Sequence, residues 1–327
     1  MRWLVVGCGS IGNRHIGNLI GIKAGDVFAC DLDKNRLNYV KTKYKIKVFN
    51  DIEKGFNQKP DVVFICTPPS SHISIALTAI KNNAHVFIEK PLSNSLDKVD
   101  KLIKTAEKKH LQVFVGYNFR FQNGLQLVKS MINERKIGRI FYARAEFAQY
   151  LPDWRPWQDY RKSYTVIKKF GGGIILDGSH EIDYMRWFFG EADKVFCFAD
   201  KISNLQVETE DLAEILIKFK KGTLCAIHLD FIRPGYSRKC EVVGEKGAII
   251  WDFSENIVKL YTLEKKYWFV KRMAGTTNDM YVEEIKHFLN AIKTGEKLLI
   301  DGHDGKKTLE LALAAKESAK SHALVKL

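Results

Sequence analysis

Residues 3–12, with the sequence WLVVGCGSIG, decide the fold of the first part of this chain. The apolar run at 3–6 predicts a short buried strand, and apolar residues from position 11 to position 20 then follow a helical period. The three glycines therefore lie in a turn between a strand and a helix. Gly7 permits a tight turn, and Gly12 lets the helix pack close to the strand.

The same turn has the features of a dinucleotide-binding loop. Gly9 lets the backbone approach a pyrophosphate, and the helix that opens at Ser10 and Ile11 offers N–H groups and a positive dipole end. Asp31 ends the second predicted strand, 19 residues past Gly12, where a carboxylate can accept both ribose hydroxyl groups. The expected cofactor is NAD. NADP is the alternative cofactor, because basic residues follow Asp31. The alternative to cofactor binding is a glycine turn that serves only packing.

Strand and helix patterns alternate over residues 1–119. After the first strand, strands are expected at 27–31, near 48, and at 61–66, 84–89 and 111–115. Helices are expected between them, including 72–82 and one capped by Ser95. Strands that are apolar on both faces are typical of a parallel sheet covered by helices on both sides. Residues 1–119 are therefore expected to form a doubly wound α/β domain, a Rossmann fold.

The pattern changes from about residue 120. Strands are expected at 140–150, 195–199, 212–219, 223–231, 239–243 and 248–251, with short ones at 261 and 267–270. The turn GEKG at 244–247 joins two consecutive strands, as in an antiparallel sheet. Helices are expected at 125–133, 278–294 and 304–321, and the last could return to the first domain. We therefore expect residues 120–327 to form an α+β domain with a large, mainly antiparallel sheet.

Two further motifs follow strands of the first domain. The sequence CTPP at 66–69 ends one strand, with a histidine opening the next helix, and Glu89-Lys90-Pro91 ends the following strand. Together with the glycine turn, these motifs resemble the Gfo/Idh/MocA family of nicotinamide-dependent oxidoreductases. The resemblance implies that Lys90 lies beside the nicotinamide and helps to handle the substrate proton. It also implies a cis Lys90–Pro91 bond. The alternative is an ordinary exposed lysine after a strand.

The segment GYNFR at 116–120 is similar to the stretch through which the family's chain leaves its first domain. On the motifs and the resemblance together, the residues expected to bind the cofactor are Gly7, Gly9, Ser10, Ile11, Gly12, Asp31, Cys66, Thr67, Pro68, His72, Glu89, Lys90 and Asn118.

The sequence GGGIILDGSHEID at 171–183 resembles the family's motif of glycines followed by an acid, a histidine and a second acid. Asp177 and His180 are three residues apart, so on one helix they share a face. A carboxylate beside an imidazole can orient it and hold its proton. Lys90, His180 and Asp177 are the expected catalytic residues, with Lys90 and His180 converging beside the nicotinamide. The alternatives are a helix-capping Asp177 and a buried structural histidine; Asp183 is expected to support helix packing.

The stretch LPDWRPWQDYRKSY at 151–164 is rich in Trp, Arg and Tyr. Aromatic faces can stack on sugar or base rings, and Arg can bind phosphate or carboxylate with two hydrogen bonds. The stretch predicts a wall or lid over the substrate, and an oligomer contact fits it equally well. The expected substrate-binding residues are Arg120, Arg155, Tyr160, Arg161 and Tyr164.

Composition narrows the classes further. The length of 327 residues predicts two domains, and 46 % hydrophobic residues allow a large core. No apolar run is long enough for a membrane helix, and no signal peptide precedes the first strand, so a cytoplasmic location is expected. The net charge of +14 is dispersed along the chain, which argues against a nucleic-acid partner and can attract an anionic substrate. The six cysteines form no CxxC pair and the histidines lack ligand spacing, so we expect reduced thiols and no metal.

By resemblance, the expected function is hydride transfer between NAD(P) and a secondary alcohol or ketone of a sugar, cyclitol or sugar nucleotide. Two alternatives remain: a glycoside hydrolase that retains NAD for redox-assisted cleavage, and a non-catalytic NAD-binding sensor. The sequence does not choose between Lys90 and His180 as the base. The resemblance also implies a homodimer or homotetramer, because the family's antiparallel sheet commonly exposes one face.

Overall fold

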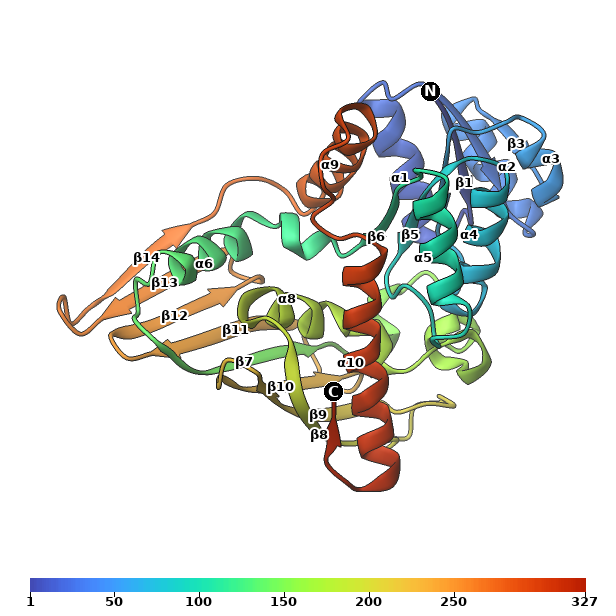
Figure 1. Ribbon diagram of the computed structural model, residues 1–327. Helices are drawn as coiled ribbons and strands as arrows, with labels where there is room; N and C mark the ends of the chain where they lie inside the picture. The colour runs from blue at the N-terminus through green and yellow to red at the C-terminus, as the bar shows by residue number, and fades with distance from the viewer. The chain divides into compact units, whose positions relative to one another are not determined.

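The chain folds into two compact units in the computed structural model, which describes residues 1–327 (Figure 1). Unit 1 comprises Met1–Asn118 and Asn278–Leu309, and unit 2 comprises Phe119–Thr277 and Glu310–Leu327. The chain first passes from unit 1 to unit 2 after Asn118, one residue before the domain boundary expected after residue 119. The return of Asn278–Leu309 to unit 1 differs from an unbroken second domain over 120–327, because Phe288 of this segment packs against core rings of unit 1.

Unit 1 is built on a sheet of six parallel strands in the order β3-β2-β1-β4-β5-β6. The strands are β1 (Arg2–Val6), β2 (Asp26–Cys30), β3 (Lys47–Phe49), β4 (Val62–Ile65), β5 (His85–Glu89) and β6 (Val113–Gly116). The chain order reverses at β1, which pairs with β2 on one side and β4 on the other. This confirms the doubly wound fold. Such sheets bind ligands beyond the carboxyl ends of the strands at this reversal.

Helices cover both faces of this sheet, with α1 and α9 packed together on one face and α4 and α5 on the other (Figure 1). The helices of unit 1 are α1 (Ser10–Gly21), α2 (Lys34–Tyr44), α3 (Ile52–Phe56), α4 (His72–Lys81), α5 (Val99–Lys108), α9 (Asp279–Thr294) and the beginning of α10 (Gly302–Ser321). Asp33 caps α2. Ser95 does not cap α5, because Lys98 adopts a left-handed conformation with φ 57° and the helix begins only after it.

Stacked aromatic rings form the core beneath α1 and α9. Phe64 and Phe87, on the neighbouring strands β4 and β5, stack with their ring centroids 4.2 Å apart. Phe288 of α9 adds an edge contact to both rings. His15 of α1 lies with its ring 5.2 Å from each of the two stacked phenylalanines. An imidazole is thereby placed in an apolar interior.

Unit 2 contains a nine-stranded sheet in the order β14-β13-β12-β11-β7-β10-β9-β8-β15. The strands are β7 (Ile140–Ala148), β8 (Ala192–Asp200), β9 (Leu212–Phe219), β10 (Leu224–Asp230), β11 (Ser237–Gly244), β12 (Gly247–Asp252), β13 (Ile257–Thr262), β14 (Trp268–Arg272) and β15 (Val325–Lys326). The β7–β10 pair is parallel and the other pairs are antiparallel, which confirms a mainly antiparallel sheet.

Three helices pack on one face of this sheet: α6 (Asn123–Asn133), α7 (Ile174–Asp177) and α8 (Ser179–Phe189) (Figure 1). On β9, buried and exposed residues alternate, as expected for a strand with one covered face. Large apolar side chains on the other face remain exposed, among them Phe198, Leu216 and Leu224. A homo-oligomer formed through this face stays a prediction.

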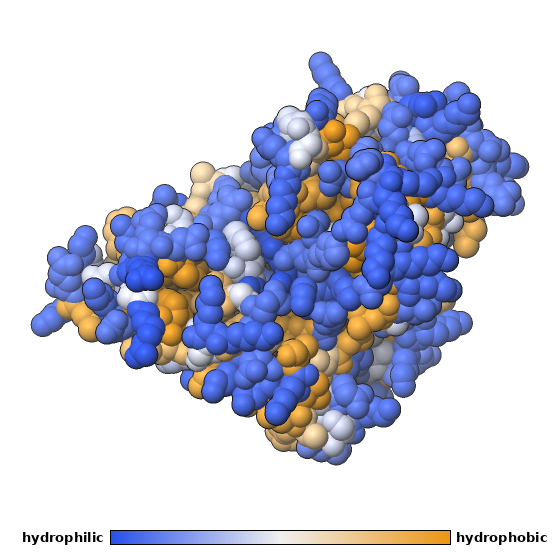
Figure 2. Space-filling model, viewed as in Figure 1, coloured by the Kyte–Doolittle hydropathy of each residue, from blue (hydrophilic) through white to orange (hydrophobic).

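The face drawn in Figure 2 is mostly hydrophilic, and the cysteines are unpaired, as the composition and the cysteine spacing predicted. Figure 2 shows hydrophilic residues over most of the visible face, with hydrophobic areas between them. No helix combines the length and the apolar character that a membrane crossing requires. All six cysteines are free and buried, and burial raises the pKa of Cys8 and of Cys197 to about 12. Thiols with such pKa values stay protonated at neutral pH and are poor nucleophiles.

Candidate functional site

The three glycines of the first turn have different surroundings. Gly7 has φ 95°, and a Cβ atom on it would lie 2.5 Å from the carbonyl oxygen of Cys66. A Cβ atom on Gly12 would lie 1.8 Å from the carbonyl oxygen of Gly7. At Gly9 the nearest atom is Nη1 of Arg36, at 3.9 Å. Packing within the protein therefore requires Gly7 and Gly12, whereas the space beside Gly9 is open to a ligand.

The N-terminus of α1 is suited to an anion. Gly9 precedes the helix without a side-chain cap, and no acidic residue stands in the first turn, which begins at Ser10 and Ile11. The first N–H groups of a helix lack partners within the helix, and its dipole favours negative charge there. These residues fit the pyrophosphate of a dinucleotide.

Asp31 follows β2 and is held by the glycine turn. Its Oδ2 accepts a hydrogen bond of 2.6 Å from the N–H of Cys8, and its Oδ1 accepts one of 2.8 Å from the N–H of Asp33. Each oxygen of a carboxylate has a second lone pair, so both can still accept from ribose hydroxyl groups. Nη1 of Arg36, a half-exposed side chain, lies 3.9 Å from Oδ2.

His72 connects the loops after β4 and β5. Its side chain is 1 % exposed, with Nε2 2.8 Å from the carbonyl oxygen of Thr67 and Nδ1 3.0 Å from that of Pro91. Burial lowers the pKa of His72, so the neutral ring donates to one carbonyl at a time. The structure therefore gives this predicted cofactor residue a role in holding Thr67 and Pro91 in place.

The Glu89-Lys90-Pro91 motif lies at the carboxyl end of β5, and its Lys90–Pro91 bond is cis, as the resemblance implied. The carboxylate of Glu89 points inward: Oε1 is 2.5 Å from Nε2 of His15, and Oε2 accepts a 3.3 Å hydrogen bond from the N–H of Lys90. Lys90 is partly exposed. Asn118, at the end of unit 1, is buried.

In unit 2, Asp177 and His180 do not share one continuous helix, which corrects the geometry expected from their spacing. Asp177 ends α7, and α8 begins after Gly178. The residue at the N-cap of α8 is Gly178, which has no side chain to cap the helix. Asp177 Oδ1 accepts a 2.8 Å hydrogen bond from the hydroxyl group of Tyr164. Both Asp177 and His180 are buried, and the ring of His180 lies 4.9 Å from that of Phe119.

Glu181, the residue after His180, forms a buried ion pair that the sequence analysis did not predict. Glu181 Oε1 lies 2.9 Å from Nε of Arg238, and both side chains are buried. The guanidinium of Arg238 also lies 4.4 Å from the ring centre of Phe119 and 3.9 Å from that of Phe147. Arg238 is 57 residues from Glu181, and no local pattern in the sequence connects them.

The predicted substrate residues have varied surroundings. Arg120 is buried and forms two hydrogen bonds, of 2.8 and 2.7 Å, to the carboxylate of Asp183. Asp183 thus supports packing, as expected. Arg161 is exposed and pairs with Asp159, and the Tyr160 hydroxyl accepts a hydrogen bond from the main chain of Gln206. Arg155 is partly exposed after a short 3₁₀ turn. The hydroxyl group of Tyr164 donates a hydrogen bond to the predicted catalytic residue Asp177.

Comparison with known proteins places this geometry in a family. Residues 1–117 match the oxidoreductase family with an NAD-binding Rossmann fold, and residues 125–250 match the GFO/IDH/MocA C-terminal domain. The chain is 31 % identical to the myo-inositol 2-dehydrogenase of Thermotoga maritima, over 100 % of this chain and 98 % of that protein. It is 24 % identical to the scyllo-inositol 2-dehydrogenase (NAD(+)) of Bacillus subtilis, over 100 % of this chain and 96 % of that protein.

Solved structures agree on the fold. Levoglucosan dehydrogenase in complex with NADH and levoglucosan has a TM-score of 0.90 at 18 % identity, covering 100 % of this chain and 99 % of its own. A probable dehydrogenase from Thermotoga maritima has a TM-score of 0.81 at 29 % identity, covering 100 % and 98 %. The chain therefore belongs to the Gfo/Idh/MocA family of oxidoreductases, and its first unit is the family's NAD-binding Rossmann domain.

Proposed function

We propose that this protein is an NAD-dependent dehydrogenase that interconverts a secondary alcohol of a cyclitol or related sugar and the corresponding ketone. The observation that carries the proposal is the 31 % identity with a myo-inositol 2-dehydrogenase over almost the whole of both chains. A second inositol dehydrogenase matches over a similar extent, which favours a cyclitol over a sugar nucleotide.

The residues of unit 1 fit NAD. The N-terminus of α1 and the open space beside Gly9 suit the pyrophosphate, and Asp31 suits the adenosine ribose. NAD bound by these residues would supply the acceptor for a hydride from the alcohol carbon. The protein has to hold the substrate carbon at that ring and take the hydroxyl proton.

Lys90 and His180 are the groups we propose for the proton. In the oxidation direction, one of them accepts the proton of the substrate hydroxyl group, while the other, together with Asp177, positions and polarises the oxygen. The hydrogen bond from Tyr164 to Asp177 supports a fixed orientation of that carboxylate. The segment 151–164 is proposed as a wall of the substrate site, with Arg155, Tyr160 and Arg161 as its polar residues.

A substrate screen tests the function. The purified protein is incubated with NAD⁺ and myo-inositol, scyllo-inositol, free aldoses or nucleotide-linked sugars, and the formation of NADH is followed by absorbance. We expect turnover with at least one cyclitol or free sugar. Cleavage of a nitrophenyl glycoside without net formation of NADH would instead identify a redox-assisted glycoside hydrolase. Tight NADH binding without turnover of any compound would identify a sensor.

Asp31 is predicted to select NAD over NADP. A carboxylate accepts two hydroxyl groups and repels a 2′-phosphate, so NADH should bind more tightly than NADPH. Replacing Asp31 by Ser should weaken NADH binding by about 10- to 100-fold, as expected for losing hydrogen bonds to a charged group. It should also reduce the difference in affinity between NADH and NADPH. Fluorescence titration with both reduced cofactors measures this. Asp33→Ser is the control, because Ser can still cap α2; tighter binding of NADPH by the unaltered protein would contradict the prediction.

A further inference from the structure

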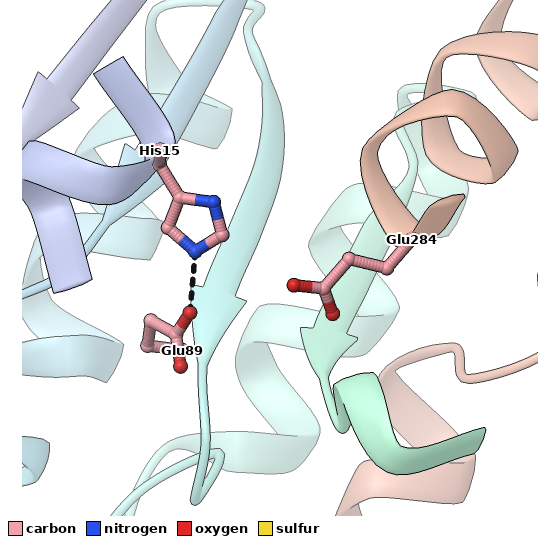
Figure 3. Close-up of side chains that lie close together, drawn as sticks. All are labelled: His15, Glu89 and Glu284. Atoms are coloured by element: carbon pink, nitrogen blue, oxygen red, sulfur yellow. Dashed lines mark hydrogen bonds and ion pairs between the residues drawn. The ribbon is translucent and has the colours of Figure 1, made fainter. Parts of the chain in front are cut away.

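Three buried titratable side chains meet inside unit 1. His15 comes from α1, Glu89 from the end of β5, and Glu284 from α9 (Figure 3). One ligand-type atom of each lies within 4.8 Å of those of the others. The exposed fractions of the three residues are 0 %, 8 % and 0 %. The cluster therefore lies in the protein interior, where the ring of His15 packs against the stacked rings of Phe64 and Phe87.

Glu284 is the unusual member. His15 and Glu89 are paired through Nε2 and Oε1, whereas neither carboxyl oxygen of Glu284 has a hydrogen-bond partner within the protein. Figure 3 shows the Glu284 side chain extending from α9 toward the His15–Glu89 pair. An ionised carboxylate without partners in an apolar interior is very costly, and such a group takes up a proton instead. The surroundings of Glu284 therefore favour its protonated, neutral form beside the ionised carboxylate of Glu89.

We propose that Glu284 is a buried carboxylic acid that stays protonated beside Glu89, and that its neutral side chain keeps Glu89 and, through it, the main chain of Lys90 in place. Glu284 is then a positioning residue. The part of the proposal that concerns Lys90 rests on the proposed dehydrogenase function. The part that concerns the proton stands on the geometry of unit 1 alone.

Electrostatics favours a protonated Glu284 beside an ionised Glu89 over two charged carboxylates. Two carboxylates this close in a medium of low dielectric constant cannot both ionise easily. Burial, and then the charge of Glu89, raises the pKa of Glu284 well above its ordinary value. The titratable and charged groups around Glu284 are His15 on α1, Cys66 after β4, Glu89 on β5 and Tyr281 on α9, with Arg14 of α1 over the ring of Tyr281. Burial also raises the pKa of Tyr281 to about 12, so this phenol stays neutral.

A divalent cation is the other way to neutralise such a cluster, because one imidazole and two carboxylates can bind zinc. Ligand atoms of zinc lie about 2.0–2.2 Å from the metal and hence about 3 Å or more from one another. His15 Nε2 and Glu89 Oε1 are 2.5 Å apart, the distance of a direct hydrogen bond. The geometry therefore favours a proton, and a bound metal becomes an outcome of the test.

The cluster reaches Lys90 through one side chain. Glu89 uses Oε1 for His15 and Oε2 for the N–H of Lys90. When Glu284 carries its proton, no repulsion between the two carboxyl groups disturbs this orientation of Glu89. Without that proton, repulsion between the two carboxylates would turn Glu89 away from the main chain that carries Lys90.

The first experiment compares Glu284→Gln with the unaltered protein. Glutamine has the shape and neutral charge of a protonated glutamate. The native state holds a proton at pH values where the unfolded glutamate is ionised, so this group lowers stability as the pH rises above about 4.5 toward the folded-state pKa. Over that range it should raise the unfolding equilibrium constant by up to about tenfold per pH unit. Glu284→Gln should lack this contribution, whereas Glu283→Gln, at an exposed neighbour, should keep it.

Two further measurements complete the test. Glu284→Gln should keep kcat near the original value. Glu284→Ala, assayed where circular dichroism shows it folded, removes the side chain that keeps Glu89 in place and should lower kcat about tenfold or more, because misplacing a reacting group by 1 Å can cost about 10²-fold. Elemental analysis of the purified protein should find no stoichiometric divalent metal.

Three results would overturn the proposal. An unchanged dependence of stability on pH in Glu284→Gln would exclude the buried proton. A stoichiometric metal that Glu284→Gln loses would make the cluster a metal site. Full kcat in folded Glu284→Ala would remove the link to Lys90 and leave the dehydrogenase function intact. If the unaltered protein turns over no substrate, the proposed function fails, and the stability measurement still decides the proton.

Discussion

Lys90→Ala is expected to lower kcat by about 10²–10⁴-fold, the usual contribution of a group that transfers a proton in the transition state. The residue lies at the carboxyl end of β5, where sheets of this kind bind ligands. Its main-chain N–H is bound by Glu89, so the variant removes the ammonium group and leaves the backbone anchored. Steady-state formation of NADH with the best substrate of the screen measures the effect.

Two variants control this experiment. Lys81→Ala removes an exposed lysine at the end of α4 and should leave kcat unchanged. The double variant Lys90→Ala, His180→Ala tests whether the two residues act on the same hydroxyl group, since groups that act as a unit lose far less together than the sum of their separate effects. Near-normal turnover of Lys90→Ala would end its proton role, and fully additive effects would argue against convergence with His180.

Arg238→Leu is expected to destabilise the protein by about 3–5 kcal/mol. The substitution removes the cation that pairs with the carboxylate of Glu181, a side chain that is 0 % exposed, and breaking a buried pair on one side costs about that amount. It also removes the contacts of the guanidinium with the rings of Phe119 and Phe147. Unfolding by urea, followed by circular dichroism, measures the change.

The matched controls separate charge burial from lost packing. Glu181→Leu combined with Arg238→Leu removes both charges and should recover much of the loss, because apolar replacements of a buried pair are often neutral. Lys286→Ala breaks the exposed pair between Lys286 and Glu283 and should change stability by about 0.5 kcal/mol or less. A double variant no more stable than Arg238→Leu would assign the effect to packing instead.

Local patterns were enough to predict the architecture. The glycine turn after the first strand predicted the Rossmann fold, because the strand, the three glycines and the helix follow one another in one short stretch of sequence; the crowding at Gly7 itself comes from the distant Cys66. The turn GEKG at 244–247 predicted two antiparallel strands, and β11 and β12 pair in this way across it. Motif resemblance placed Lys90 after β5 and predicted its cis bond to Pro91.

Predictions from local sequence patterns were wrong where a turn interrupts the expected helix. Ser95 is followed by a turn with Lys98 in a left-handed conformation, so α5 begins later than expected. The spacing of Asp177 and His180 assumed a single helix, and Gly178 divides it. The return of Asn278–Leu309 to unit 1 depends on which core its apolar face joins, and helical periodicity alone does not identify that core.

By itself the sequence determined the parallel and antiparallel sheets, the NAD-binding turn and the family, since each depends on residues close together in the chain. Only the tertiary structure decided which distant polar groups meet: Tyr164 with Asp177, Glu181 with Arg238, and His15 with Glu89 and Glu284. The physical reason is that an isolated polar group is too costly to bury, so each must find its partner inside the fold, and that partner is chosen by three-dimensional packing and not by spacing along the chain.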